Sequence, residues 1–307
     1  MQRLASPHRS GWTLRERQEF IKGLAYISPW LIGFLAFIAY PVGAALYYSL
    51  SSYDLLRPPE FIGLANYYEI FFEDEFNPKV LYNTIYYVLL GVPAGIVTAF
   101  LLACLLNTNM VGRPFFRTLF FIPSIVPVVS SAMVWLWVFN TQYGVINMFL
   151  VSRGLPAIPF LSSPDLAKLS LIIIHCWSSG GAMIIFLAAL QDVPKHLYDA
   201  ATVDGAGAWS RFRHITIPMC TPAILFNLLT GVIGAFQYFT FAWILTQGGP
   251  NRATEFYSVY LSRNAFSFLK MGYASALAWV LFLIVMVFTL LIFRSSARWV
   301  YYGGTSN

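Results

Sequence analysis

Long stretches without a charged side chain constrain this sequence more than any other feature. Six of them contain no Asp, Glu, Lys or Arg: Gly23–Tyr53, Val80–Gly112, Thr118–Ser152, Leu169–Gln191, Ile215–Asn251 and Met271–Phe293. Each can hold the ~20 apolar residues of a helix that crosses a bilayer. Strands of a membrane barrel would instead alternate polar and apolar residues over ~10-residue segments. The sequence therefore predicts an all-α, polytopic membrane protein with six transmembrane helices, near residues 26–50, 82–106, 115–138, 169–190, 220–245 and 273–293.

The distribution of the remaining charges predicts an orientation in the membrane. Charged residues make up only 10% of the chain, against about 25% in an average soluble domain. With six spans, both termini share one side with loops 107–114 and 192–218, and that side carries 12 of the 19 Lys and Arg residues. The positive-inside rule therefore predicts cytoplasmic termini in the inner (plasma) membrane. The net charge of +6 then reflects topology and contact with membrane lipid, with no nucleic-acid partner.

The predicted helices form a single membrane domain flanked by two short tails. Residues 1–24 are polar and basic and are expected to be a cytoplasmic N-terminal tail, and residues 295–307 a cytoplasmic C-terminal tail. Residues 25–294 hold the six spans and their connections. The three cysteines lie far apart in apolar stretches, which is neither a disulfide framework nor a metal-binding spacing, so no metal site is expected.

One connecting segment, LYDAATVDGAGAWSRFRHITIP, differs from the apolar sequence on either side of it. It belongs to the longest predicted cytoplasmic loop, residues 192–218. A helix is predicted over Lys195–Val203, ending at Asp204 and Gly205 because glycine readily adopts the conformation of a helix stop. Asp204 is expected to cap a second short helix over residues 206–214. The small side chains near the bend would let another protein approach closely; an amphipathic loop lying in the lipid headgroups is the alternative.

This segment resembles the EAA loop of the permeases of binding-protein-dependent ABC importers. The family pattern is Glu-Ala-Ala, a Gly after three further residues, and a later Ile-x-Leu-Pro. Here the pattern reads Asp199-Ala200-Ala201, then Gly205, then Ile215-Thr216-Ile217-Pro218, with Asp in place of Glu and Ile in place of Leu. The resemblance implies that this loop couples the chain to a separate ATPase, with Asp199 contacting a basic residue of that partner. The coupling residues it implies are Tyr198, Asp199, Ala200, Ala201, Asp204, Gly205 and Ala206.

Further matches are similar to the carbohydrate branch of the same family, which includes maltose, glycerol-3-phosphate and multiple-sugar permeases. They are LTQGGPNRATEFYSVYLSRNAFSFLKMGYASALA (residues 245–278), FIGLANY (residues 61–67) and Tyr40-Pro41. Together the resemblance extends from about residue 25 to 294. It implies a maltose-permease-like fold for this permease domain and the import of a sugar or sugar-like solute.

The same resemblance implies several partners. A second permease subunit, usually a different but related chain, would complete the pore. Two cytoplasmic ATPase subunits would bind the loops, and an extracytoplasmic solute-binding protein would deliver the solute. The chain has no G-x-x-x-x-G-K-[ST] motif, which is the loop that cradles ATP phosphates. We therefore expect no cofactor on this chain, with ATP and Mg on the partner ATPase, and no enzymatic activity of its own.

Polar residues inside the predicted spans mark a candidate solute path. The six uncharged stretches hold no Asp, Glu, Lys or Arg, and His175 is the one titratable exception. This argues against proton coupling and favours a neutral, hydroxyl-rich solute. Aromatic faces, amides and hydroxyl groups suit sugars, and the fourth and fifth spans line the cavity in maltose-type relatives, where Gln237 matches a cavity-lining amide. The candidates are His175, Trp177, Ser178, Ser179, Asn227, Gln237, Tyr238 and Thr240. Each of them could instead serve helix packing.

Two other functions are compatible with a chain of this composition. The first is a stand-alone secondary carrier for a neutral solute. The second is a membrane enzyme acting on a lipid-linked sugar, which is disfavoured because no Ser/His/acid triad, metal cluster or pair of carboxylates can be placed on one face.

Overall fold

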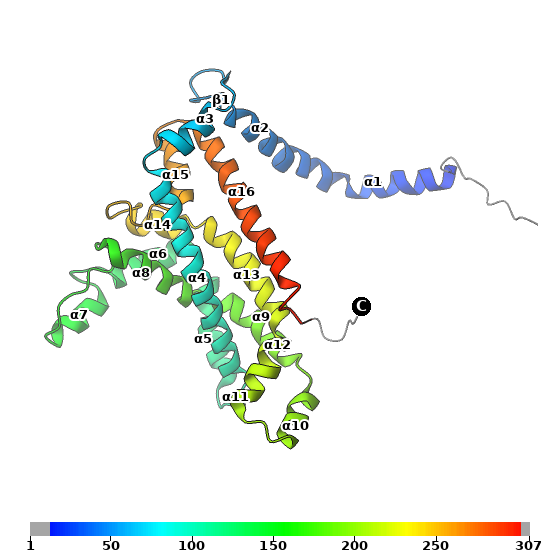
Figure 1. Ribbon diagram of the computed structural model, residues 1–307, viewed down its shortest axis with the longest axis vertical. Helices are drawn as coiled ribbons and strands as arrows, with labels where there is room; N and C mark the ends of the chain where they lie inside the picture. The colour runs from blue at the N-terminus through cyan, green and yellow to red at the C-terminus, as the bar shows by residue number, and fades with distance from the viewer. Residues whose placement is uncertain (1–12, 302–307) are drawn as a thin grey trace, which may run out of the picture.

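The computed structural model describes residues 13–301, which are mostly helical (Figure 1). The ends of both predicted tails, residues 1–12 and 302–307, lie outside the described residues. Two short strands, β1 (Ser51–Ser52) and β2 (Glu60–Phe61), pair antiparallel with Ser51 opposite Phe61. The predicted all-α class is confirmed.

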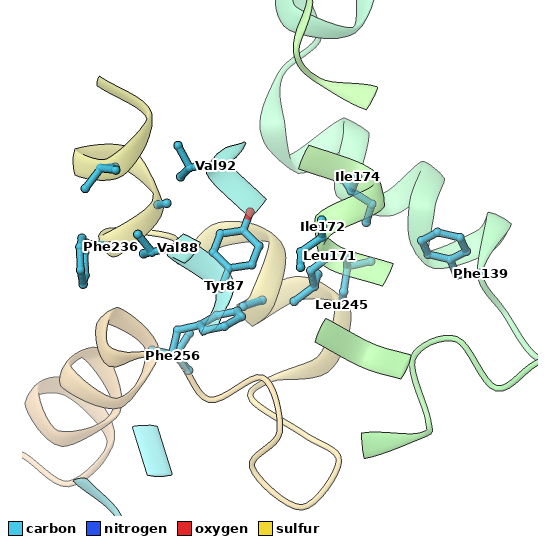
Figure 2. Close-up of a cluster of buried hydrophobic side chains, with 14 residues drawn as sticks. Tyr87, Val88, Val92, Phe139, Leu171, Ile172, Ile174, Phe236, Leu245 and Phe256 are labelled. Carbon is cyan, nitrogen blue, oxygen red and sulfur yellow. The ribbon is translucent and has the colours of Figure 1, made fainter. Parts of the chain in front are cut away.

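Three long helices form the centre of the molecule. They are α4 (Asn77–Leu106), α13 (Thr221–Phe236) and α16 (Met271–Ser296), and α13 contacts both of the others (Figure 1). Because lipid is as apolar as their side chains, close packing rather than the hydrophobic effect holds such helices together. A Cβ on Gly231 would lie 3.1 Å from Cγ1 of Val92, so the missing side chain lets α13 approach α4. Val92 belongs to a cluster of buried apolar side chains, in which Tyr87, Phe236 and Phe256 are fully buried (Figure 2).

The first helical segment is an arm that leaves this bundle. The helix α1 (Leu14–Phe34), the π-helical turn η1 (Leu35–Ala39) and α2 (Tyr40–Ser49) form one 36-residue helix. It begins where Thr13 and Glu16 form a capping box, each side chain accepting from the other residue's amide. The helix therefore starts inside the predicted tail rather than near residue 26. α2 packs against α16, whereas α1 buries no residue and points away from the bundle (Figure 1).

Predicted spans three and four prove to be bent pairs of helices, and a third bent pair joins the end of the predicted loop to span five. Within the described residues, three helices are long and apolar enough to cross a membrane, and the number rises to six if each bent pair counts as one span. The pairs are α5 (Arg113–Ile125) with α6 (Val128–Val138) at 100°, α8 (Pro164–Trp177) with α9 (Gly180–Gln191) at 46°, and residues 208–219 with α13 at 61°.

The structure corrects the predicted extents of spans three and five. Between α5 and α6, Val126 is extended with ψ 133°, because Pro127 excludes the helical conformation from the residue before it. The predicted single helix over 115–138 is therefore wrong. The predicted span 220–245 is also wrong at its end: α13 stops at Phe236, and α14 (Thr240–Thr246) turns to pack against α6.

The two ends of the bundle carry different segments (Figure 1). At the strand end lie β1, α3 (Ala65–Tyr68), η2 (Glu69–Glu73), α15 (Tyr257–Ser262) and η4 (Arg263–Ser267). At the opposite, loop end lie α10 (Lys195–Val203), α11 (Ala208–Arg211), η3 (Phe212–Thr216) and α12 (Ile217–Met219). The helix α7 (Val145–Ser152) projects to one side. This separation agrees with the predicted placement of loop 192–218 opposite the segment near residue 60.

Candidate functional site

A cavity of about 470 Å³ lies between α4, α13 and the break that separates α8 from α9. Five of the eight predicted path residues line it: His175, Ser178, Ser179, Asn227 and Tyr238. Its wall also includes Ser124 and Thr230, and none of its lining side chains, all from the described residues, is Asp, Glu, Lys or Arg. The cavity is therefore uncharged but carries hydroxyl, amide and imidazole groups.

The α8–α9 break brings two serines to the cavity wall. α8 ends at Trp177, and α9 restarts at Gly180, where a Cβ would lie 2.4 Å from the Phe120 carbonyl oxygen of α5. Glycine is required there because α5 passes so close. Ser178 Oγ donates to the Ile174 carbonyl. Ser179 Oγ is buried and has no hydrogen-bond partner among residues 13–301, which leaves it available to a solute hydroxyl.

His175 packs directly onto the backbone of α4. A Cβ added to Gly95 would lie 2.7 Å from His175 Nε2, and the edge of the imidazole faces the Tyr87 ring with 6.0 Å between centroids. Tyr87 in turn packs against Tyr238, with 4.4 Å between ring centroids. Gly95 therefore sets how far the imidazole reaches into the cavity.

Asn227 and Thr230 follow each other along the cavity face of α13. Asn227 is buried, and its amide nitrogen donates to the Ala223 carbonyl. Thr230 Oγ1 donates to the Phe226 carbonyl. Among residues 13–301, the hydrogen bonds of both side chains run along α13 itself.

Three predicted path residues do not line the cavity. Trp177 is 39% exposed and packs edge-on against Trp135. Gln237 is exposed at the C-cap of α13, and Thr240 begins α14. Small residues missed by the sequence reading line it instead, among them Gly95, Gly181, Gly231 and Gly234. For Gly231 and Gly234 the signal was their spacing of four and seven residues from Asn227, which puts all three on one face of span five.

The loop at the opposite end confirms the predicted helix and bend. α10 spans Lys195–Val203, and Gly205 is left-handed with φ +75°. The Gly205 amide donates to the Thr202 carbonyl, and the Ala206 amide donates to the Ala201 carbonyl at 2.8 Å. This pair of bonds is a Schellman motif, in which glycine avoids the strain of a left-handed residue.

One detail of the loop differs from the prediction. Asp204 is the C-cap of α10, whereas the N-cap of α11 is Gly207 and makes no side-chain bond, so Asp204 does not cap the second helix. Tyr198 is half-buried, and its hydroxyl hydrogen-bonds Thr216 Oγ1 at 2.9 Å and fastens α10 to η3.

The face of this loop is polar with two apolar projections. Asp199, Ala200 and Asp204 are exposed, and Ala201 and Ala206 are half-buried. Val203 is 89% exposed and Trp209 is 70% exposed, on either side of the bend. An exposed Trp beside small residues is typical of a protein-binding surface.

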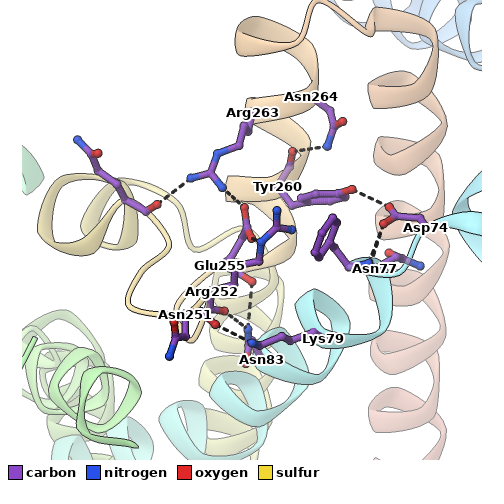
Figure 3. Close-up of polar contacts among 12 residues, drawn as sticks. Asp74, Asn77, Lys79, Asn83, Asn251, Arg252, Glu255, Tyr260, Arg263 and Asn264 are labelled. Atoms are coloured by element: carbon purple, nitrogen blue, oxygen red, sulfur yellow. Dashed lines mark hydrogen bonds and ion pairs between the residues drawn. The ribbon is translucent and has the colours of Figure 1, made fainter. Parts of the chain in front are cut away.

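The strand end is held together by a network of charged and polar side chains (Figure 3). Glu255 is fully buried and pairs with Arg252, at 3.4 Å between Nε and Oε2, and with Arg263. Asn83 of α4 donates to the Arg252 carbonyl at 2.7 Å. Ser258 Oγ donates to the carbonyl of Tyr238 in the cavity wall at 2.7 Å. These bonds link the strand end to α4 and to the cavity residue Tyr238, and we call this network the roof.

A second part of this roof centres on Asp74. Its carboxylate accepts from Tyr260, at 2.7 Å, and from Tyr273. Burial and the bond to Asp74 raise the pKa of Tyr260 to about 12, so the phenol keeps its proton near neutral pH.

The sequence matches the family described as "Binding-protein-dependent transport system inner membrane component" over residues 91–300, which is more than half of the chain. The chain belongs to this family. The permease is 43% identical over 290 residues to the probable ABC transporter permease protein YesP of Bacillus subtilis, covering 93% of this chain and 94% of the relative.

Other relatives and a solved structure agree in length and fold. The permease is 35% identical to the sulfoquinovosyl glycerol transport system permease SmoG of Agrobacterium fabrum, with 84% of each chain covered. It is 32% identical to the trehalose/maltose transport system permease MalF of Thermococcus litoralis, over 87% of this chain and 91% of the relative. A chain of a bacterial alginate ABC transporter superposes with a TM-score of 0.83 at 23% identity, over 92% of this chain and 96% of that chain.

Membership establishes the general role of the chain. It is a membrane subunit of an ABC importer, works with a solute-binding protein and ATPase partners, and lies in the inner membrane. It is a transporter subunit rather than an enzyme, because ATP is hydrolysed by a separate subunit. Nothing in these similarities supports the stand-alone carrier.

Proposed function

We propose that this permease imports a neutral sugar or glycoside and that the cavity is its half of the solute path. The observation that carries this proposal is the uncharged wall of the cavity, with Ser179 Oγ unpaired and polar groups of His175 and Asn227 nearby. An anionic solute would need a cationic or anion-binding group to offset its desolvation. Trehalose and maltose, the named solutes of one relative, are neutral sugars and support this solute class.

Uptake by the complete transporter tests this proposal. The permease would be reconstituted in proteoliposomes with its partner permease, ATPase and binding protein, and uptake of maltose, trehalose and lactose compared with uptake of glucuronic acid. ATP-dependent uptake of at least one neutral sugar, without uptake of the acid, is expected. Uptake of the acid alone would refute the neutral solute class.

We also propose that loop 192–218 is the contact with the ATPase. The bend at Gly205 presents Asp199, Val203 and Trp209 at the loop end, away from the cavity roof. In this arrangement the loop and both termini are cytoplasmic, and ATP and Mg²⁺ bind only to the ATPase. Asp199→Lys is expected to reduce co-purification of the ATPase while the permease still enters the membrane. Unchanged co-purification would remove Asp199 from the contact.

The full assembly then contains this chain, a second and different permease, two ATPase subunits and one binding protein. ATP binding moves the two loops, and the pore alternates between facing outward and facing inward. The solute enters under the strand-end roof and leaves toward the loop end.

A further inference from the structure

Two lysines at the strand end of the cavity lack a carboxylate partner. Lys79 lies in the first turn of α4, and Lys168 lies near the start of α8. Among the described residues neither takes part in an ion pair, although Asp165 on α8 attracts Lys168. Lys270 at the same end, by contrast, pairs with Glu69 at 3.3 Å. Two positive charges are therefore left without direct compensation.

Hydrogen bonds to the segment that follows α14 hold both ammonium groups in place. Lys79 Nζ donates to the Asn251 carbonyl at 2.6 Å (Figure 3). Lys168 Nζ donates to Asn83 Oδ1 at 3.1 Å, and the amide nitrogen of Asn83 in turn donates to the Arg252 carbonyl. Because an ammonium group has three N–H donors, each lysine keeps donors for a further acceptor. Fixing a long side chain on binding costs conformational entropy, and these bonds lower that cost in advance.

Two tyrosine rings orient Lys168 without neutralising it. Its Nζ lies 5.0 Å from the ring centroid of Tyr82 and 4.7 Å from that of Tyr86. The face of an aromatic ring attracts a cation, but the ring carries no net charge. Tyr82 is 60% exposed, so this group of side chains reaches the surface of the chain. We call Lys79, Lys168, Tyr82 and Tyr86 the basic patch.

The basic patch lies on the cavity faces of its two helices. On α8, Lys168 precedes His175 by seven residues, and on α4, Tyr82 precedes Ile96 by fourteen. These intervals are about two and four helical turns, so the members of each pair share a face. His175 and Ile96 both line the cavity. The patch is therefore at the strand-end mouth of the cavity.

We infer that the basic patch receives an acidic side chain of the extracytoplasmic solute-binding protein. Membership of the family supplies this partner, and the structure adds which residues meet it and with which charge. A carboxylate placed between the two lysines relieves their mutual repulsion. It also accepts charge-assisted hydrogen bonds from both ammonium groups, which are stronger than bonds between neutral groups.

Two other anions fit the basic patch less well. The solute is proposed to be neutral, and the cavity beyond the patch has no Lys or Arg among its lining residues to receive an acid. A lipid phosphate would lie on faces of α4 and α8 turned away from the cavity, whereas the patch shares the faces of His175 and Ile96. The inference rests on the proposed solute path and on the proposed orientation, in which the strand end is extracytoplasmic.

Binding of the purified solute-binding protein to the complete transporter in lipid nanodiscs tests the basic patch. Kd would be measured without added solute, at low and at high salt concentration. Lys79→Gln and Lys168→Gln are each expected to raise Kd about fivefold at low salt and by less at high salt, because salt screens exposed charges. Lys270→Gln is the matched control, since it removes the same charge from the same end but from an existing ion pair, and should leave Kd unchanged. Lys168→Arg keeps the charge and should restore most of the affinity.

Several outcomes would overturn the inference. One is a Kd for Lys79→Gln and Lys168→Gln that equals the Kd for Lys270→Gln at low salt. Another is an increase in Kd that high salt does not reduce, because a structural defect is not screened. ATP hydrolysis without the binding protein checks that each variant assembles, and Lys79→Gln, on the exposed first turn of α4, decides if Lys168→Gln does not.

A third outcome would assign the patch to the solute instead. The unsubstituted transporter would import glucuronic acid, and Lys168→Gln would abolish this uptake without changing the Kd of the binding protein. The Kd comparison uses no solute, so a wrong solute class appears only in the uptake assay, whereas a wrong docking site appears only in Kd.

Discussion

The bend at Gly205 allows a sharp test of loop coupling, because a matched glycine lies two residues away. Gly205 has φ +75°, Gly207 has φ −67°, and a Cβ added to either would meet nothing within 4 Å. Alanine at both positions therefore adds the same methyl group to open space. Only Gly205→Ala places an L side chain in the left-handed region.

The cost of this conformation is about 1–2 kcal/mol for a residue with a Cβ. The bent conformation of the loop is destabilised by the same amount. Its population relative to other loop conformations therefore falls by a factor of about 5–30. We expect Gly205→Ala to lower the amount of solute imported per ATP hydrolysed, and Gly205→Asn to lower it less because asparagine tolerates this region. Gly207→Ala should behave like the unsubstituted permease.

The assay measures maltose uptake, or uptake of whichever neutral sugar the transporter accepts, together with ATP hydrolysis in the same proteoliposomes. Membrane insertion and assembly are checked by co-purification. If Gly205→Ala and Gly207→Ala import the same amount of solute per ATP hydrolysed, the left-handed bend does not transmit the movement of the ATPase.

Three further predictions concern the cavity and its roof. Gly95→Ala should displace the His175 ring, 2.7 Å from the new Cβ, at a cost of about 1–3 kcal/mol, and should raise KM for solute. Gly91→Ala on the same helix does not line the cavity, and its Cβ would lie no closer than 3.5 Å to a neighbouring atom, so it is the control; equal KM values would exclude a cavity role for His175. Ser179→Ala should leave Tm unchanged, because Oγ has no partner among the described residues, but raise KM; an unchanged KM would show that Oγ does not contact solute. Glu255→Gln should lower the free energy of unfolding by about 1–3 kcal/mol, because two arginines lose a buried carboxylate partner. Glu69→Gln, in the exposed pair with Lys270, is the control and should change Tm little. Equal shifts of Tm in the two variants would contradict this prediction.

The positions of helices were largely predictable from the sequence, but their breaks were not. Lack of charge marks where a chain can enter lipid, and it located α4 and α16 closely. It carries no signal for a bend, because Val126 and Phe236 are as apolar as their neighbours. The bend at Pro127 had a local cause that could have been used, whereas the end of α13 at Phe236 is set by the packing of α14 on α6.

The candidate sites were predictable to different degrees for physical reasons. The bend at Gly205 follows from local backbone preferences, so the sequence located it correctly. Which polar residues share a cavity depends on how separate helices rotate against one another. Gln237 was expected in the path but lies just beyond the end of α13, and Gly95 could be recognised only once His175 was seen against it.

The arm formed by α1 has a consequence for which substitutions the chain tolerates. None of its residues is buried against the rest of the permease, so exchanging one apolar side chain for another there changes no contact on which folding of this subunit depends. The substitutions that α1 tolerates are limited instead by what lies beside it, which is lipid or a neighbouring subunit. The residues of α1 should therefore vary with the thickness of the host membrane and with the neighbouring chains, independently of substitutions in the bundle.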